Sequence, residues 1–296
     1  MSTPTPPHIG IFDSGIGGLS VLRALRREVP QARLTYIADS RHTPWGERPS
    51  AWVVARSLQL SAYLLDLRAD LVLVACNTAT TLAIAALRAR WPSGRFVGVE
   101  PGIKPAVAAS RNGRVAVLAT RATLGSARLD QLATRHAAGA TLLRLPCPGL
   151  VEAIEQVGKD DGALGARLDA IATELTAQRI DTVVLGCTHY PLVADALARR
   201  LGPEVLLVDT ADAVVRQVLR LLGDANLLPD PACARPGTVV DAARTRLPLL
   251  LATGSADRLQ LAARRWVAEA AEAETLCLPD PPTDTGRQQR SLRQTL

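Results

Sequence analysis

Short apolar runs alternate with longer helical patterns along most of this chain of 296 residues. Such alternation is typical of parallel strands joined by crossover helices, so we predict an α/β protein with mainly parallel sheets flanked by helices. Strands are expected at residues 9–12, 34–38, 71–75, 96–99, 115–119, 141–145, 182–185 and 205–208. Helices are expected at residues 19–28, 51–67, 80–90, 129–137, 163–178, 192–201 and 213–222.

The scheme repeats in both halves, and the chain reaches the size at which a single hydrophobic core usually divides. Two similar lobes are therefore expected. The segments 100–102 and 209–210 each follow a predicted strand, where the chain would cross between lobes. We expect residues 1–100 and 209–296 to form one discontinuous lobe and residues 101–208 to form the other.

The pattern weakens beyond residue 230. Strands are expected at 238–241 and 249–252, and a helix at 256–270. The last segment, 279–296, is rich in proline and charged residues, a composition typical of a disordered tail.

Composition excludes several function classes. The net charge of +6 comes from basic residues spread over predicted helix faces and the tail, so nucleic-acid binding is not expected. No run reaches about 18 apolar residues, so no membrane span is expected. The five cysteines include no CxxC pair, which argues against a disulfide framework and a zinc pattern. Free thiols indicate a reducing compartment, and we predict a cytoplasmic protein.

Cys76 and Cys187 each come just after an apolar run and just before a predicted helix. Ligands of open α/β sheets bind at the carboxyl ends of strands, so two thiols there would face one small molecule from opposite sides. That geometry suggests proton transfer on both faces of a carbon. The helix start at Cys76 is expected to lower the pKa of that thiol. The alternative is a buried cysteine that acts as a small hydrophobe.

Polar residues accompany both cysteines. Asn77 and Thr78 supply donors suited to a substrate carboxylate. His189 is interpreted as a general acid/base or as the partner that tunes Cys187. A metal half-site at Cys187 and His189 is the alternative, but no further ligand stands at suitable spacing, so no metal site is expected.

Three other segments carry polar groups. The glycine-rich loop 13–18 opens a helix, where its N–H groups would hold an anion or simply make a tight turn, and Asp13 has no obvious packing role there. The loop 39–47 contains a Pro-Trp-Gly turn and is either a binding rim or a plain connection. Glu152 and Glu155 would share a helix face, with solvent exposure as the default.

Segments 12–20, 75–79 and 185–191 together resemble the signatures of glutamate racemases, cofactor-independent enzymes of the aspartate/glutamate racemase superfamily. The resemblance implies two α/β lobes with the active site in the cleft between them. It implies interconversion of L- and D-glutamate, which supplies D-glutamate for peptidoglycan. Glutamate would be the small-molecule partner, and no cofactor would be needed. A homodimer is compatible with the sequence.

The same resemblance implies roles for single residues. Cys76 and Cys187 would be the acid/base pair, with Asp13 poising Cys76 and with His189 and Glu155 poising Cys187. Glu152 lies close enough to leave that carboxylate assignment open. The implied substrate-binding residues are Asp13, Ser14, Trp45, Gly46, Asn77, Thr78, Thr188 and His189. Trp45 stands where the family usually has tyrosine.

Three other functions are considered as alternatives. A racemase for aspartate or another small amino acid differs by as little as one methylene, worth about 1–3 kcal/mol in a pocket. A non-enzymatic ligand-binding protein with two lobes comes from a different class. A thiol-redox role is third, and the absence of CxxC counts against it.

Overall fold

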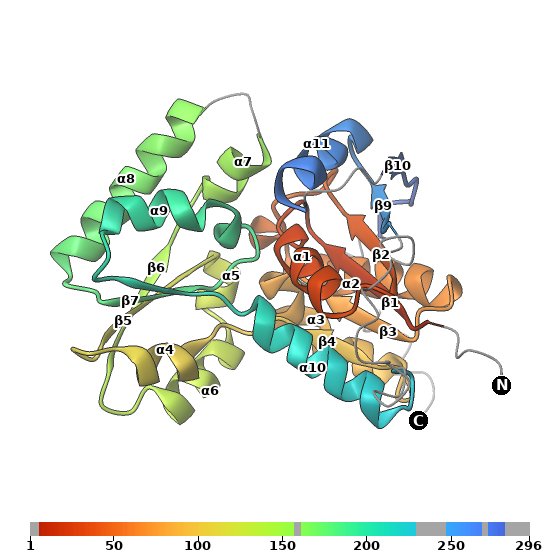
Figure 1. Cartoon of the computed structure of the whole chain (residues 1–296), viewed down its shortest axis with the longest axis horizontal. Coiled ribbons are helices and arrows are strands. Elements are labelled where there is room, and N and C mark those ends of the chain that lie inside the picture. Colours follow the sequence, from red (N-terminus) through yellow and green to blue (C-terminus); the bar gives the residue numbers. More distant parts are fainter. Residues whose placement is uncertain (1–5, 157–160, 229–246, 268–271, 282–296) are drawn as a thin grey trace, which may run out of the picture.

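Two parallel β-sheets lie side by side, each with helices on both faces (Figure 1). The computed structural model describes residues 6–156, 161–228, 247–267 and 272–281. The first sheet has the strand order β10-β9-β2-β1-β3-β4 and the second β6-β5-β7-β8. Every strand pair among the described residues is parallel, in agreement with the predicted fold class.

The two sheets draw on different parts of the chain. The first contains β1 (His8–Asp13), β2 (Arg33–Ala38), β3 (Leu71–Val74), β4 (Phe96–Gly98), β9 (Leu249–Ala252) and β10 (Ala273–Thr275). The second contains β5 (Arg114–Ala119), β6 (Thr141–Pro146), β7 (Thr182–Leu185) and β8 (Leu206–Val208). We propose that the chain divides into lobes as predicted, with crossings near residues 100 and 209.

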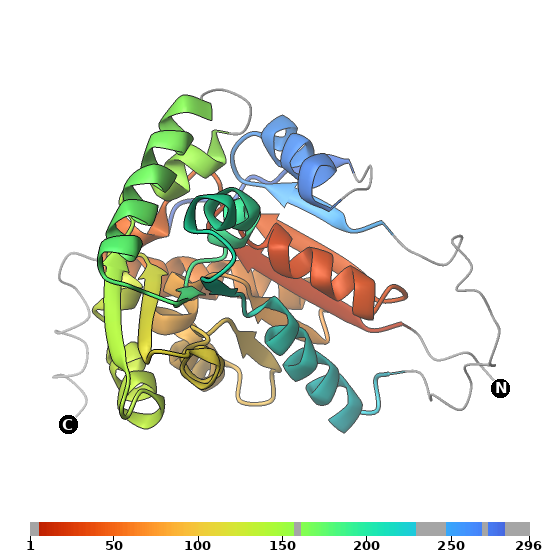
Figure 2. The same cartoon turned by 60° about the vertical axis from the view of Figure 1, so that its left-hand side comes forward.

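Within the part of the chain that the structure describes, five helices cover the first sheet. One face carries α1 (Leu19–Glu28), α10 (Ala211–Asp224) and α11 (Ala256–Trp266), and the other carries α2 (Ser50–Asp66) and α3 (Asn77–Arg90). Helix α10 follows the second sheet in sequence but packs on α1, as the two views agree (Figures 1 and 2). This contact supports the predicted return of the chain to the first lobe.

Helices also cover both faces of the second sheet. One face carries α4 (Ile103–Ala109) and α6 (Ala127–His136), and the other carries α7 (Leu150–Glu155), α8 (Asp161–Ala177) and α9 (Ala194–Leu201). Short helices also lie in loops, namely η1 (Trp45–Glu47), α5 (Arg121–Leu124) and η2 (Tyr190–Val193). None of the helices in the described ranges is both long and apolar enough to cross a membrane.

Alternation along the strands explains these layers. In β5, Ala116 and Leu118 pack with α8 and α9, whereas Val115 and Val117 pack with α4 and α6. Successive side chains of a strand point to opposite faces, so a strand buried on both sides is apolar throughout. Continuous apolar runs were therefore a reliable signal for the central strands.

Some boundaries differ from the prediction. Helix α3 begins at Asn77 instead of residue 80, because Cys76 has extended backbone angles and already serves as the N-cap. Helix α11 ends at Trp266, before the expected residue 270. The strand expected at 238–241 lies outside the described residues. Residues 279–281 fall in the predicted tail, and there the Pro279 carbonyl accepts a hydrogen bond from Arg56.

Candidate active site

The carboxyl ends of the two sheets meet, and the polar residues that follow their strands come together there. Asp13 ends β1, Cys76 follows β3, and Cys187 follows β7. All three are buried, with exposed fractions of 0% for Asp13, 5% for Cys76 and 6% for Cys187. The strand-end rule thus brings one thiol from each sheet into one buried polar region.

Asp13 joins the two sheets. Its Oδ1 accepts hydrogen bonds from the Gly15 amide at 2.8 Å and from the Ser14 hydroxyl at 3.2 Å. Its Oδ2 accepts a bond from the Thr188 hydroxyl at 2.7 Å, across the junction. Burial raises the pKa of Asp13 to about 6, although the charge of His189 and the bond from Thr188 act in the opposite direction.

Cys76 lies at the start of α3, and its thiol donates to the Ser14 hydroxyl at 3.8 Å. Burial first, and then the negative charge of Asp13, raise the pKa of Cys76 to about 12. The prediction that the helix start lowers this pKa is therefore wrong, because loss of solvent outweighs the backbone hydrogen bond from Ala79. A charge on Cys187 raises it further, so the two thiols interact electrostatically.

Cys187 is accompanied by an imidazole and a carboxylate. Its sulfur lies 3.9 Å from His189 Nδ1, and His189 Nε2 lies 2.7 Å from Glu155 Oε1. Burial lowers the pKa of His189, but the bonds to Cys187 and Glu155 outweigh burial and raise this pKa well above its ordinary value. These two contacts therefore favour the protonated form of His189. The carboxylate that reaches it is Glu155, and Glu152 lies earlier on the same short helix, α7.

The loop after β1 fits closely against the second lobe. The Ile16 amide donates to Glu155 Oε1 at 2.8 Å, and the Ser20 hydroxyl contacts the Thr188 carbonyl at 3.2 Å. A Cβ at Gly17 would collide with His189, so this close approach requires glycine. The glycines of this loop thus allow contact between the lobes.

Two threonines make a second cross-lobe contact. Thr78, in the first turn of α3, and Thr120, just after β5, have hydroxyl oxygens 3.1 Å apart. Gly46 approaches the same threonine, because a Cβ built there would lie 2.8 Å from Thr120 Cβ. The Pro-Trp-Gly turn therefore borders the second lobe at the edge of the site.

Asn77 has one free acceptor. Its Nδ2 donates to the Val99 carbonyl at 3.3 Å, which fixes the amide orientation, and its buried Oδ1 has no hydrogen-bond partner among the described residues. Buried polar atoms are usually paired. An N–H donor of a bound molecule would satisfy this oxygen.

The Trp45 side chain faces the core of the first lobe. Its Nε1 donates to Asp39 Oδ2 at 3.1 Å, and its ring packs near Phe12 and Trp52. His42 also contacts Asp39 through Nδ1 at 3.2 Å. We propose that any contact of position 45 with a substrate is made by its backbone.

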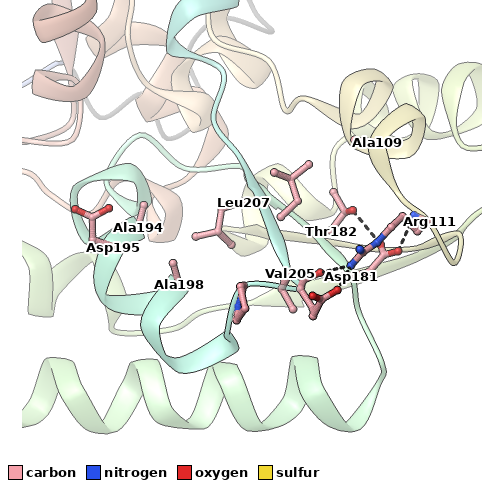
Figure 3. Close-up of a pocket in the computed structure, with 12 residues that line it drawn as sticks. Ala109, Arg111, Asp181, Thr182, Ala194, Asp195, Ala198, Val205 and Leu207 are labelled. Atoms are coloured by element: carbon pink, nitrogen blue, oxygen red, sulfur yellow. Dashed lines mark hydrogen bonds and ion pairs between the residues drawn. The ribbon is translucent and has the colours of Figure 1, made fainter.

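A separate hollow of about 480 Å³ lies at the opposite end of the second sheet (Figure 3). In its lining, Arg111 pairs with Glu204 at 2.7 Å, and Asp181 accepts a hydrogen bond from the Arg111 amide at 2.7 Å. None of the predicted site residues lines it. Within the described ranges, no group of three or more His, Cys, Asp or Glu side chains is arranged to hold a metal ion.

Sequence reasoning missed two residues of this region. Thr120 follows β5 as Cys187 follows β7, so the strand-end rule would have found it. Tyr36 lies inside β2, and its hydroxyl donates to the Gly15 carbonyl at 2.6 Å. An aromatic residue in a strand is ordinary core, so no sequence signal marked it.

Parallel strands whose carboxyl ends gather buried polar side chains are typical of α/β enzymes that act on small molecules. A family profile described as Asp/Glu/hydantoin racemase matches residues 16–218. The chain belongs to this family, and it is an amino-acid racemase. Family membership favours an enzyme over the non-enzymatic binding protein considered above.

Similar proteins with assigned names are consistent with this family membership. The chain is 44% identical over 228 residues to a glutamate racemase from Pseudomonas aeruginosa, covering 77% of this chain and 86% of that protein. A glutamate racemase from Escherichia coli, solved with L-glutamate and the activator UDP-MurNAc-Ala, is 31% identical with a TM-score of 0.76, covering 93% and 99% of the two chains. One from Bacillus anthracis is 26% identical with a TM-score of 0.79 and the same coverage.

Proposed function

We propose that this protein interconverts L- and D-glutamate without a cofactor by a two-base mechanism at Cys76 and Cys187. The observation that carries the proposal is the burial of one thiol from each sheet around the bond between Asp13 and Thr188. One thiol would remove the Cα proton on one face, and the other would deliver a proton on the opposite face.

The electrostatics support a division of labour between the thiols. The raised pKa of Cys76 keeps that group protonated, and the His189 imidazole, whose Nδ1 lies 3.9 Å from the Cys187 sulfur, is placed to accept the proton that Cys187 gives up. This state is suited to L-glutamate: Cys187 takes the Cα proton and Cys76 donates its own, which yields the D isomer. The reverse reaction starts from the opposite protonation state, in which Cys76 removes the proton.

A Cα–H beside a carboxylate is a very weak acid, so the protein must stabilise the developing negative charge. The N-terminal end of α3 would face the substrate carboxylates. The hydroxyl groups of Ser14, Thr78 and Thr188 would donate to them by turning away from their present partners, Asp13 and Thr120. The free Oδ1 of Asn77 would accept a hydrogen bond from the substrate ammonium group. These contacts are strongest where water is excluded.

Burial of the thiols has a consequence for substrate entry. With Cys76 and Cys187 only 5% and 6% exposed, the lobes must separate to admit an amino acid and close again around it. The cross-lobe bonds of Asp13 and Glu155 are the contacts that would break and reform.

Glutamate is favoured as the substrate because the relatives named above are glutamate racemases. Aspartate, one methylene shorter, is the second candidate, and a panel of amino acids assayed by chiral chromatography separates the two. The proposed role is the supply of D-glutamate for peptidoglycan. A homodimer and a cytoplasmic location stay predictions from the sequence.

The mechanism is tested by changing each cysteine to serine. We expect Cys76→Ser and Cys187→Ser each to lower racemisation by about 100- to 10,000-fold, the usual worth of a general acid/base group. Solvent deuterium incorporation at Cα is measured in the same samples. Cys277→Ser, at an exposed thiol, is the matched control and should keep full activity. Full racemase activity in either of the first two variants would contradict the two-base mechanism.

A further inference from the structure

Tyr36 holds the glycine-rich loop that follows β1. It lies in β2 and is buried, and its hydroxyl donates a 2.6 Å hydrogen bond to the Gly15 carbonyl. Its ring also fits closely against Gly18, where an added Cβ would lie 2.9 Å from the ring. The loop after β1 therefore rests on this one side chain of the neighbouring strand.

The peptide group that Tyr36 holds is the one that reaches the second lobe. The Gly15 carbonyl and the Ile16 N–H belong to the same planar unit, so fixing one fixes the other. The Ile16 N–H donates to Glu155 Oε1 at 2.8 Å. A hydrogen bond in the first lobe thus sets the direction of a donor that enters the second.

The connection continues to the thiol. The same oxygen, Glu155 Oε1, lies 2.7 Å from His189 Nε2, and His189 Nδ1 lies 3.9 Å from the sulfur of Cys187. Each hydrogen bond in such a chain polarises the next. The contacts run from Tyr36 through one peptide group, one carboxylate and one imidazole to Cys187.

We propose that Tyr36 is a positioning residue for proton transfer at Cys187, acting through the Gly15–Ile16 peptide and Glu155. The proposal rests on the proposed function, in which Cys187 takes the proton from L-glutamate. The Tyr36 hydroxyl keeps its proton and so remains a hydrogen-bond donor, because burial and the nearby charge of Asp13 raise its pKa well above the ordinary value. The contacts described above end at Cys187, so its effect is expected at that thiol.

The test is Tyr36→Phe, which keeps the ring and removes only the hydroxyl. We expect kcat/KM to fall about tenfold, because a buried carbonyl loses its partner. The two enantiomers have equal free energy, so kcat/KM falls equally in both directions and does not reveal which thiol is impaired. The primary isotope effect on kcat/KM, measured separately with L- and D-glutamate deuterated at Cα, does reveal it.

If Tyr36 positions Cys187, proton transfer at Cys187 becomes more rate-limiting. The isotope effect then rises for deuterated L-glutamate and falls towards one for deuterated D-glutamate. Tyr63→Phe, in α2, is the matched control and should leave both isotope effects unchanged. An isotope effect is a ratio measured on active molecules, so partial unfolding of the variant does not alter it.

Two outcomes distinguish failure of the role proposed for Tyr36 from failure of the proposed function. Isotope effects in Tyr36→Phe equal to those of the wild type, with Cys187→Ser inactive, overturn the positioning role alone. Normal racemisation by Cys187→Ser overturns the proposed function, and the positioning role falls with it.

Discussion

The hydroxyl of Thr188 donates a 2.7 Å hydrogen bond to the carboxylate of Asp13, and this bond joins the carboxyl ends of the two sheets. Asp13 is fully buried, so the bond replaces water that the carboxylate would otherwise bind. The Asp13 carboxylate therefore belongs to the contact between the two lobes, and its protonation depends on whether the lobes are in contact.

Asp13→Asn should remove a pH dependence of stability. The folded protein holds the Asp13 proton up to about pH 6, whereas the unfolded chain releases it near 3.8, so folding stability falls as pH rises between these values. The loss amounts to about 3 kcal/mol at most. Urea unfolding at pH 4 and pH 7 should show wild type losing that much more stability than the variant. Equal losses in both proteins would show that Asp13 titrates normally.

Glu155→Gln should make activity sensitive to pH near neutrality. Removing the carboxylate lowers the pKa of His189, so the imidazolium beside Cys187 is lost at a lower pH than in the wild type. Activity of the variant should therefore decline as pH rises through a range where the wild type is steady. NMR titration of histidine-labelled protein measures the shift directly.

The matched control for this variant is Glu152→Gln, the same change three residues earlier on α7. It should leave the His189 titration and the pH profile of activity as in the wild type. An unchanged His189 titration in Glu155→Gln would rule out the proposed role of that carboxylate.

Gly46→Ala should prevent full closure of the lobes. The new methyl group would lie 2.8 Å from Thr120 Cβ, closer than carbon atoms approach, so the turn or the second lobe must shift. We expect kcat/KM to fall about tenfold or more, since small misplacements of catalytic groups are costly. Gly125→Ala, whose new Cβ would have its nearest neighbour at 3.5 Å, is the control and should retain wild-type kinetics.

Trp45→Tyr should affect stability more than catalysis. The indole is buried and bonds to Asp39, so a smaller ring leaves a cavity and removes one of the hydrogen bonds to that carboxylate, a loss of about 1–3 kcal/mol. The backbone at position 45 is preserved, so kcat/KM should stay within about threefold of wild type. Chemical unfolding and steady-state kinetics on the same sample compare the two effects. A large kinetic loss without loss of stability would place the side chain in the substrate pocket.

Local patterns were sufficient for the sheets and for the ends of their strands. Apolar runs predicted β3 and β7 because a strand buried on both faces must be apolar throughout, and the thiols of Cys76 and Cys187 follow those strands directly. Asp13 was marked in the same way, as a carboxylate without a packing role. These are properties of a short stretch of chain, and sequence reasoning reads them well.

Contacts between distant residues were decided by the tertiary structure. Only the packing of α7 against the loop after β1 selects Glu155 over Glu152, and only the burial of Cys76 beside Asp13 reverses the expected direction of its pKa. The role inferred for Tyr36 depends on where a peptide bond of the loop after β1 lies. Spacing along the chain specifies which residues can share an element, but desolvation and hydrogen-bond partners depend on how the elements pack together.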